Sequence, residues 1–165
     1  MTDPTPVPVA TLLSEKRLAF LDFDVAAGAP GVAQREISNP RIQKPGLALA
    51  GYLPYVKSGR LQILGNSEYA YLDTLDPDLA DERLMQVLGR GVPALVSAKG
   101  NRPRERVLAY SDQHQVPFLV TSAMTSDVIE VVSSFLEDAL APRVQRHGVL
   151  VDVFSLGTLI LGDPG

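Results

Sequence analysis

The C-terminal residues carry the pattern with the clearest chemical meaning. Gly162-Asp-Pro-Gly165 follows the apolar run Thr158–Leu161 and supplies the first four positions of the pattern G-x-x-x-x-G-K-[ST]. In such loops, glycines let backbone N–H groups turn toward phosphates, a lysine adds positive charge and a hydroxyl holds magnesium. We therefore predict the entrance of an ATP-binding loop at Gly162, Asp163, Pro164 and Gly165. A Gly-x-x-Gly pattern after a strand is also typical of an ordinary turn, so this alternative stays open.

A histidine precedes the same segment. Residues 148–154 and 158–161 are apolar runs joined by a short turn, which predicts a β-hairpin. Folding this hairpin about Leu156 places His147 opposite Gly165, within a residue or so. An imidazole has a reference pKa of about 6.5, so it can stabilise or transfer charge beside phosphates near neutral pH. His147 is therefore a candidate catalytic residue, although a histidine at the start of a strand is more often structural.

Other charged residues give weaker signals. Arg102-Pro-Arg-Glu-Arg106 favours a solvated helix start over a nucleic-acid patch, because no aromatic residues lie between the arginines to stack on bases. Asp22 and Asp24 would share one strand face by alternation, but they lack further partners at metal-ligand spacing and are more typical of solvated edge residues. No metal site is predicted within the chain, and His114 is given no role.

Composition limits the class of protein. Of 165 residues, 45% are hydrophobic and 21% are charged, which is typical of soluble globular proteins. The formal charge of −4 disfavours nucleic acid as a partner, and there is no cysteine for disulfides or thiol chemistry. The N-terminus lacks a secretory signal and no apolar stretch reaches transmembrane length, so we expect a cytoplasmic protein without membrane contact.

Short apolar runs alternate with helical patterns along most of the chain. This order predicts an α/β domain at residues 1–142, with a mainly parallel or mixed sheet covered by helices. Strands are expected at 19–23, 35–37, 60–64, 93–97 and 117–120, a turn at 28–31, and helices at 9–18, 79–88, 103–114 and 125–140. Residues 143–165 are expected to begin a second domain, and the apolar hairpin without a following helix predicts a piece of a longer protein.

The sequence resembles the HPr kinase/phosphorylase family. Segments in the family's order and spacing cover nearly the whole chain; they are Pro45–Tyr52, Arg60–Gly65, Glu68, Tyr71–Leu72, Leu140–Pro142, His147–Val153 and Leu159–Gly162. The resemblance implies an N-terminal α/β domain of the kind shared with some Mur ligases, followed by the beginning of a truncated C-terminal kinase domain. In that family, one enzyme phosphorylates a serine of the phosphocarrier HPr with ATP or pyrophosphate and removes the phosphate by phosphorolysis, which regulates carbon metabolism.

The resemblance also assigns residues and partners. His147 matches the family's active-site histidine, and Gly162–Gly165 match the first half of its ATP loop. The loop lysine, the magnesium-binding serine and the catalytic aspartate would lie beyond Gly165, so these 165 residues are expected to be inactive alone and to bind neither ATP nor Mg²⁺. The family is hexameric, and HPr would bind through the missing C-terminal domain. The alternative left open is a free-standing ligand-binding or interaction domain of the same fold.

Overall fold

A mixed four-stranded sheet forms the centre of the main domain in the computed structural model, which describes residues 5–142, 148–153 and 156–161. The strand order is β2-β6-β5-β4, with β4, β5 and β6 parallel and β2 antiparallel to β6. The strands are β2 (Asp24–Ala27), β4 (Gln62–Leu64), β5 (Leu95–Ser97) and β6 (Phe118–Val120). This arrangement confirms the predicted α/β fold with a mainly parallel sheet.

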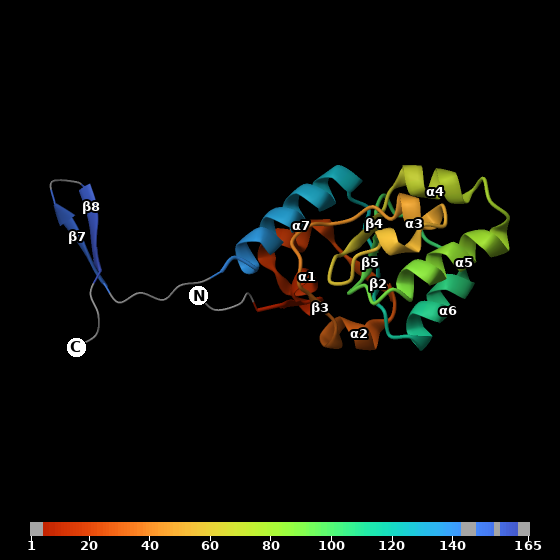
Figure 1. Cartoon of the computed structure of the whole chain (residues 1–165), viewed down its shortest axis with the longest axis horizontal. Coiled ribbons are helices and arrows are strands. Elements are labelled where there is room, and N and C mark those ends of the chain that lie inside the picture. Colours follow the sequence, from red (N-terminus) through yellow and green to blue (C-terminus); the bar gives the residue numbers. More distant parts are fainter. Residues whose placement is uncertain (1–4, 143–147, 154–155, 162–165) are drawn as a thin grey trace.

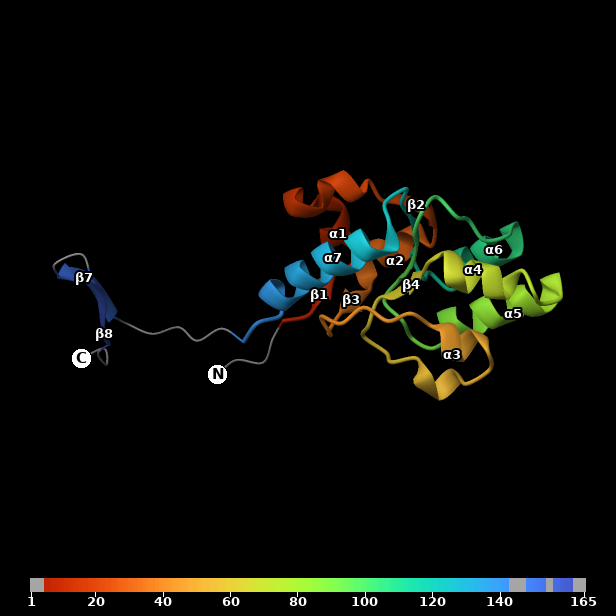
Figure 2. The ribbon, with the colours of Figure 1, turned by 90° about the horizontal axis from the view of Figure 1, so that it is seen from above.

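Helices cover both faces of this sheet, as Figures 1 and 2 show. On one face, Val96 and Leu119 belong to a core shared with α1, η1 and α7, while on the other Leu95 and Phe118 pack with α3, α4, α5 and α6. Alternate residues of each strand thus pack into the cores on opposite faces of the sheet. Every residue of the three parallel strands is buried. The helices are α1 (Ala10–Ser14), η1 (Lys16–Leu21), α2 (Ala29–Gln34), α3 (Gly46–Leu49), η2 (Leu53–Tyr55), α4 (Asn66–Leu72), α5 (Pro77–Leu88), α6 (Glu105–Gln113) and α7 (Thr125–Ala139).

The predicted strand at 19–23 is wrong. Residues Lys16–Leu21 form a 3₁₀ helix that ends at Asp22, whose φ of 45° is left-handed, and β2 begins only at Asp24. Asp22 and Asp24 therefore do not share a strand face. The short apolar run fits either structure, and packing decides between them: Leu18 and Leu21, three residues apart, are both buried while Phe20 is exposed.

The predicted turn at 28–31 is instead the beginning of α2. Gly28 caps this helix with a left-handed φ of 69°. A Cβ atom built on Gly28 would lie 2.0 Å from the carbonyl oxygen of Val116, so only glycine fits there. The close approach brings α2 against the chain that leads into β6.

Two further pairs of strands complete the fold. β1 (Val7–Pro8) pairs antiparallel with β3 (Glu36–Ile37), which confirms the strand expected at 35–37. β7 (Gly148–Val153) and β8 (Leu156–Leu161) form an antiparallel hairpin, as predicted. The boundary between domains at residues 142 and 143 stays a prediction.

Candidate functional site

The predicted catalytic and nucleotide-binding residues lie outside the described part of the chain. His147 and Gly162–Gly165 are not among the described residues, although the strands beside them are. The outermost pair of the hairpin joins Gly148 and Leu161, which directly follow and precede these residues in the sequence.

The predicted register of the hairpin is wrong by three residues. It would have placed Val149 opposite Asp163, whereas Val149 pairs with Ile160. The reason is a tighter connection, because β8 begins at Leu156 rather than Thr158 and pairing continues to Val153 and Leu156. The observed pairing includes backbone groups of residues 156 and 157, which the predicted three-residue turn would have left without strand hydrogen bonds.

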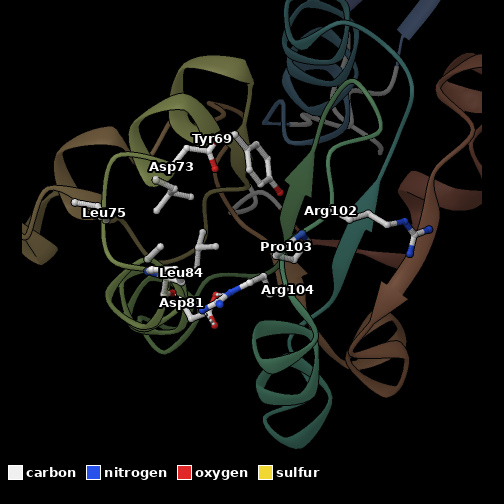
Figure 3. A pocket seen from close by; sticks show the side chains of 11 residues that line it. Tyr69, Asp73, Leu75, Asp81, Leu84, Arg102, Pro103 and Arg104 are labelled. Carbon is white, nitrogen blue, oxygen red and sulfur yellow. Dashed lines mark hydrogen bonds and ion pairs between the residues drawn. The ribbon is translucent and has the colours of Figure 1, made fainter.

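Within the described domain, a cavity of about 270 Å³ lies between α4, α5 and the segment 102–104 (Figure 3). Six side chains make its wall apolar: Leu72, Leu75, Pro77, Ala80, Leu84 and Pro103. Five polar residues also line it: Tyr69, Asp73, Asp81, Arg102 and Arg104. The segment 102–104 follows β5, so the cavity lies toward the carboxyl ends of the parallel strands, where ligands of open α/β sheets commonly bind.

Tyr69 links the cavity to the end of β5. Its hydroxyl lies 2.8 Å from Ser97 Oγ, and Ser97 Oγ donates its own proton to the carbonyl oxygen of Asn101 at 2.7 Å. Tyr69 must therefore be the donor in the first bond. Burial raises the pKa of Tyr69 to about 12, so the phenol is neutral over the physiological range.

Arg104 and Asp81 form a two-bond ion pair on the α5 side of the cavity. Arg104 Nε lies 3.0 Å from Asp81 Oδ1, and Nη2 lies 2.6 Å from Oδ2. The Asp81 side chain is only 5% exposed, against 52% for Arg104. The hydrogen bond to Asp81 raises the pKa of Arg104, which keeps the guanidinium charged and the buried carboxylate paired.

The neighbouring arginines also form pairs. Arg102 pairs with Asp24 on β2, and Arg106 Nη1 lies 3.5 Å from Asp78 Oδ1. Each arginine of the segment 102–106 thus contacts a carboxylate on another element. The three arginine side chains are also more than half exposed, so this helix start is solvated as predicted while its ion pairs join α6 and the end of β5 to neighbouring elements.

Glu68 holds the beginning of α4 and so places Tyr69. Its carboxylate accepts a hydrogen bond from the backbone N–H of Gly65 at 2.8 Å, and Lys44 Nζ lies 3.4 Å away. An acid three residues into a helix commonly accepts this bond. The pattern Gly65 to Glu68 is therefore explained by helix capping.

The cavity residues were not singled out by sequence reasoning. Asp81 could have been noticed in the sequence. It lies three and seven residues before Leu84 and Leu88, so it occupies the apolar face of the predicted helix, where a charged residue is unexpected. Its partner Arg104 lies 23 residues away in the sequence, a separation that no local pattern reveals. His114, which received no role, stacks on Tyr110 with 3.9 Å between ring centroids.

In the described ranges 5–142, 148–153 and 156–161, no group of three or more His, Cys, Asp or Glu residues could hold a metal ion. No helix in the part of the chain that the structure describes is both long and apolar enough to span a bilayer.

Comparisons with known proteins give one consistent result. Residues 7–136 match the family described as "HPr Serine kinase N terminus". The HPr kinase/phosphorylase of Caldicellulosiruptor bescii is 34% identical over 150 residues, which is 91% of this chain and 48% of that protein. The HPr kinase/phosphorylase of Geobacter sulfurreducens is 38% identical over 145 residues, 88% of this chain and 45% of that protein. The chain spans about half the length of these curated relatives.

Proposed function

The chain belongs to the HPr serine kinase N-terminus family, and on this premise we propose that it forms the N-terminal part of an HPr kinase/phosphorylase. The observation that carries the proposal is the similarity to two such enzymes over about nine tenths of this chain. The whole enzyme would transfer phosphate from ATP or pyrophosphate to a serine of HPr in the cytoplasm and remove it by phosphorolysis.

The reaction requires positioning and charge stabilisation more than covalent chemistry by the protein. In this proposal Gly162–Gly165 begin the loop that surrounds the ATP phosphates, and His147 stabilises or transfers charge beside them. The pairing of Gly148 with Leu161 supports the proposal, because both segments adjoin the same end of one hairpin. The lysine, the magnesium ligand and the catalytic aspartate would come from the half that the chain does not cover.

The domain at residues 1–142 would then contribute assembly or positioning. Its described cores pack on both faces of the sheet, so it can fold around its own centre. We propose that residues 143–165 belong to the kinase domain and that the complete protein assembles as a hexamer. HPr would bind through the kinase domain.

A chimera tests this function. Residues 1–165 are joined to the C-terminal half of the Geobacter sulfurreducens relative, and phosphorylation of HPr is measured with ATP and Mg²⁺. We expect the chimera to phosphorylate HPr and residues 1–165 alone to be inactive. The unmodified relative serves as a positive control, and circular dichroism establishes that the chimera is folded. A folded chimera without activity would contradict the proposal, as would activity of residues 1–165 alone.

A second candidate function is a ligand-binding domain, and the cavity beside Tyr69 favours it. The two candidate functions require different residues. Ligand binding by the cavity needs only residues of the described domain, whereas phosphoryl transfer needs residues after it.

A further inference from the structure

We propose that the cavity between α4, α5 and residues 102–104 binds a small organic ammonium compound, with its apolar body inside and its charged group at Asp73. This inference concerns the described domain alone and goes beyond the proposed kinase function.

The volume limits the ligand to a small molecule. At about 270 Å³ the cavity lies just below the range of about 300–1,000 Å³ that is usual for ligand pockets. A branched aliphatic group of four or five carbons would bury its surface against Leu72, Leu75 and Leu84, which come from α4, the following turn and α5.

The charges in the cavity favour a cation. Arg104 and Asp81 neutralise each other through two hydrogen bonds, and Figure 3 shows Arg104 running toward Asp81. Arg102 points away from the cavity in the same view and pairs with Asp24. Asp73 is exposed at the cavity mouth, and among the described residues its carboxylate accepts no hydrogen bond and forms no ion pair, so this negative charge has no partner from this domain.

Tyr69 adds a second acceptor. Since its proton is donated to Ser97 Oγ, its oxygen presents lone pairs rather than a donor to a ligand. Tyr69 and Asp73 lie four residues apart on α4 and its C-terminal end, so both project from one side of this helix. An ammonium group would pair with the Asp73 carboxylate and meet only an acceptor at Tyr69, whereas a carboxylate would be repelled by Asp73.

The experiment compares three probes of the same shape with the 165-residue chain. Isopentylamine carries the ammonium group, isopentanol is neutral and isovalerate is anionic. Binding is followed by backbone amide chemical shifts at neutral pH. We expect saturable shifts confined to α4, α5 and residues 102–104 with isopentylamine only. A ligand of this size should bind with a Kd of about 1 mM.

Three variants locate the site. Asp73→Asn should weaken isopentylamine about tenfold, because it removes the charge that pairs with the ammonium group. Ala80→Leu should abolish binding by filling the cavity while the amide spectrum remains that of a folded protein. Glu137→Gln neutralises an exposed carboxylate on α7, away from the cavity, and should bind like the wild type.

Four results would overturn the proposal. They are equal or tighter binding of isopentanol or isovalerate, unchanged affinity in Asp73→Asn, retained binding in Ala80→Leu, and no saturable shift with isopentylamine in the wild type. Each can be obtained whether or not the chimera phosphorylates HPr, so failure of this inference is distinguishable from failure of the proposed kinase function.

Discussion

Removing the Tyr69 hydroxyl should change stability in opposite directions at neutral and at high pH. At pH 7 the hydroxyl donates one hydrogen bond to Ser97 Oγ at 2.8 Å. An intramolecular hydrogen bond of this kind contributes about 1 kcal/mol net. We therefore expect Tyr69→Phe to lower the free energy of unfolding by about 1 kcal/mol at pH 7.

The effect of pH follows from the shifted ionisation of the phenol. Burial raises the pKa of Tyr69 from 10.0 to about 12 in the folded protein, so the folded state holds the proton more tightly than the unfolded chain does. The resulting stability is fully present below pH 10 and is lost as the pH rises from 10 to 12. A shift of this size corresponds to about 2.7 kcal/mol, at about 1.4 kcal/mol per pH unit.

Together, the lost hydrogen bond and the shifted ionisation predict that the stability curves of wild type and Tyr69→Phe cross as the pH rises. Wild type should be more stable than Tyr69→Phe by about 1 kcal/mol at pH 7 and less stable by about 1–2 kcal/mol at pH 12. The two proteins should be equally stable near pH 11, since about 1 kcal/mol of the pH-dependent loss has occurred by then. The crossing is diagnostic, because loss of packing alone would shift stability by the same amount at every pH.

Urea unfolding of both proteins, followed by far-UV circular dichroism from pH 7 to pH 11.5, measures this difference. Ionisation of the other tyrosines and of lysines occurs in both proteins and cancels. Tyr71→Phe is the matched control, because it removes a phenol hydroxyl from an exposed position on the same helix; at pH 7 it should change stability by less than about 0.5 kcal/mol. A difference between wild type and Tyr69→Phe that stays constant with pH would refute the reasoning.

Further variants test the fold and the proposed kinase function. Gly28→Ala should lower the free energy of unfolding by at least about 2 kcal/mol in urea titrations, because a left-handed backbone and the Val116 carbonyl leave no space for a Cβ atom. Gly46→Ala, where the added Cβ would meet nothing within 4 Å, is the control and should be neutral or stabilising by about 0.5 kcal/mol. In the chimera, His147→Ala should slow phosphorylation and phosphorolysis by about 10²–10⁴-fold with unchanged thermal unfolding; near-normal rates in both directions would show that His147 has no catalytic role. Calorimetry should detect at most weak ATP binding to residues 1–165, which hold only the first four positions of the loop pattern; micromolar affinity would place the nucleotide site elsewhere.

The central elements could be predicted because hydrophobic periodicity determines them. Thr125–Leu140 carries an apolar stripe at helical spacing, and α7 spans Thr125–Ala139. The apolar runs that begin at Pro93 and Pro117 became β5 and β6, each buried on both faces. These signals are local, so no knowledge of distant contacts was needed.

The strand expected at 19–23 was wrong because local hydrophobic patterns do not distinguish a short strand from a tight helix. Phe20 and Leu21 are adjacent and apolar, which fits a strand or a tight helix equally well. The 3₁₀ helix buries Leu21 completely and leaves Phe20 63% exposed. Which of the two enters the core depends on α7, more than 100 residues later, whose side chains share that core. Tertiary packing therefore decided the local structure.

The candidate site could be predicted only in part for a related reason. One wall of the cavity comes from α4, whose beginning is fixed by Glu68, a residue in the segments that carry the family resemblance. The opposite wall comes from Pro77–Leu84 and residues 102–104, which lie outside those segments. Asp81 and Arg104 lie outside the residues that carry the resemblance, so that resemblance gave no signal for this wall of the cavity.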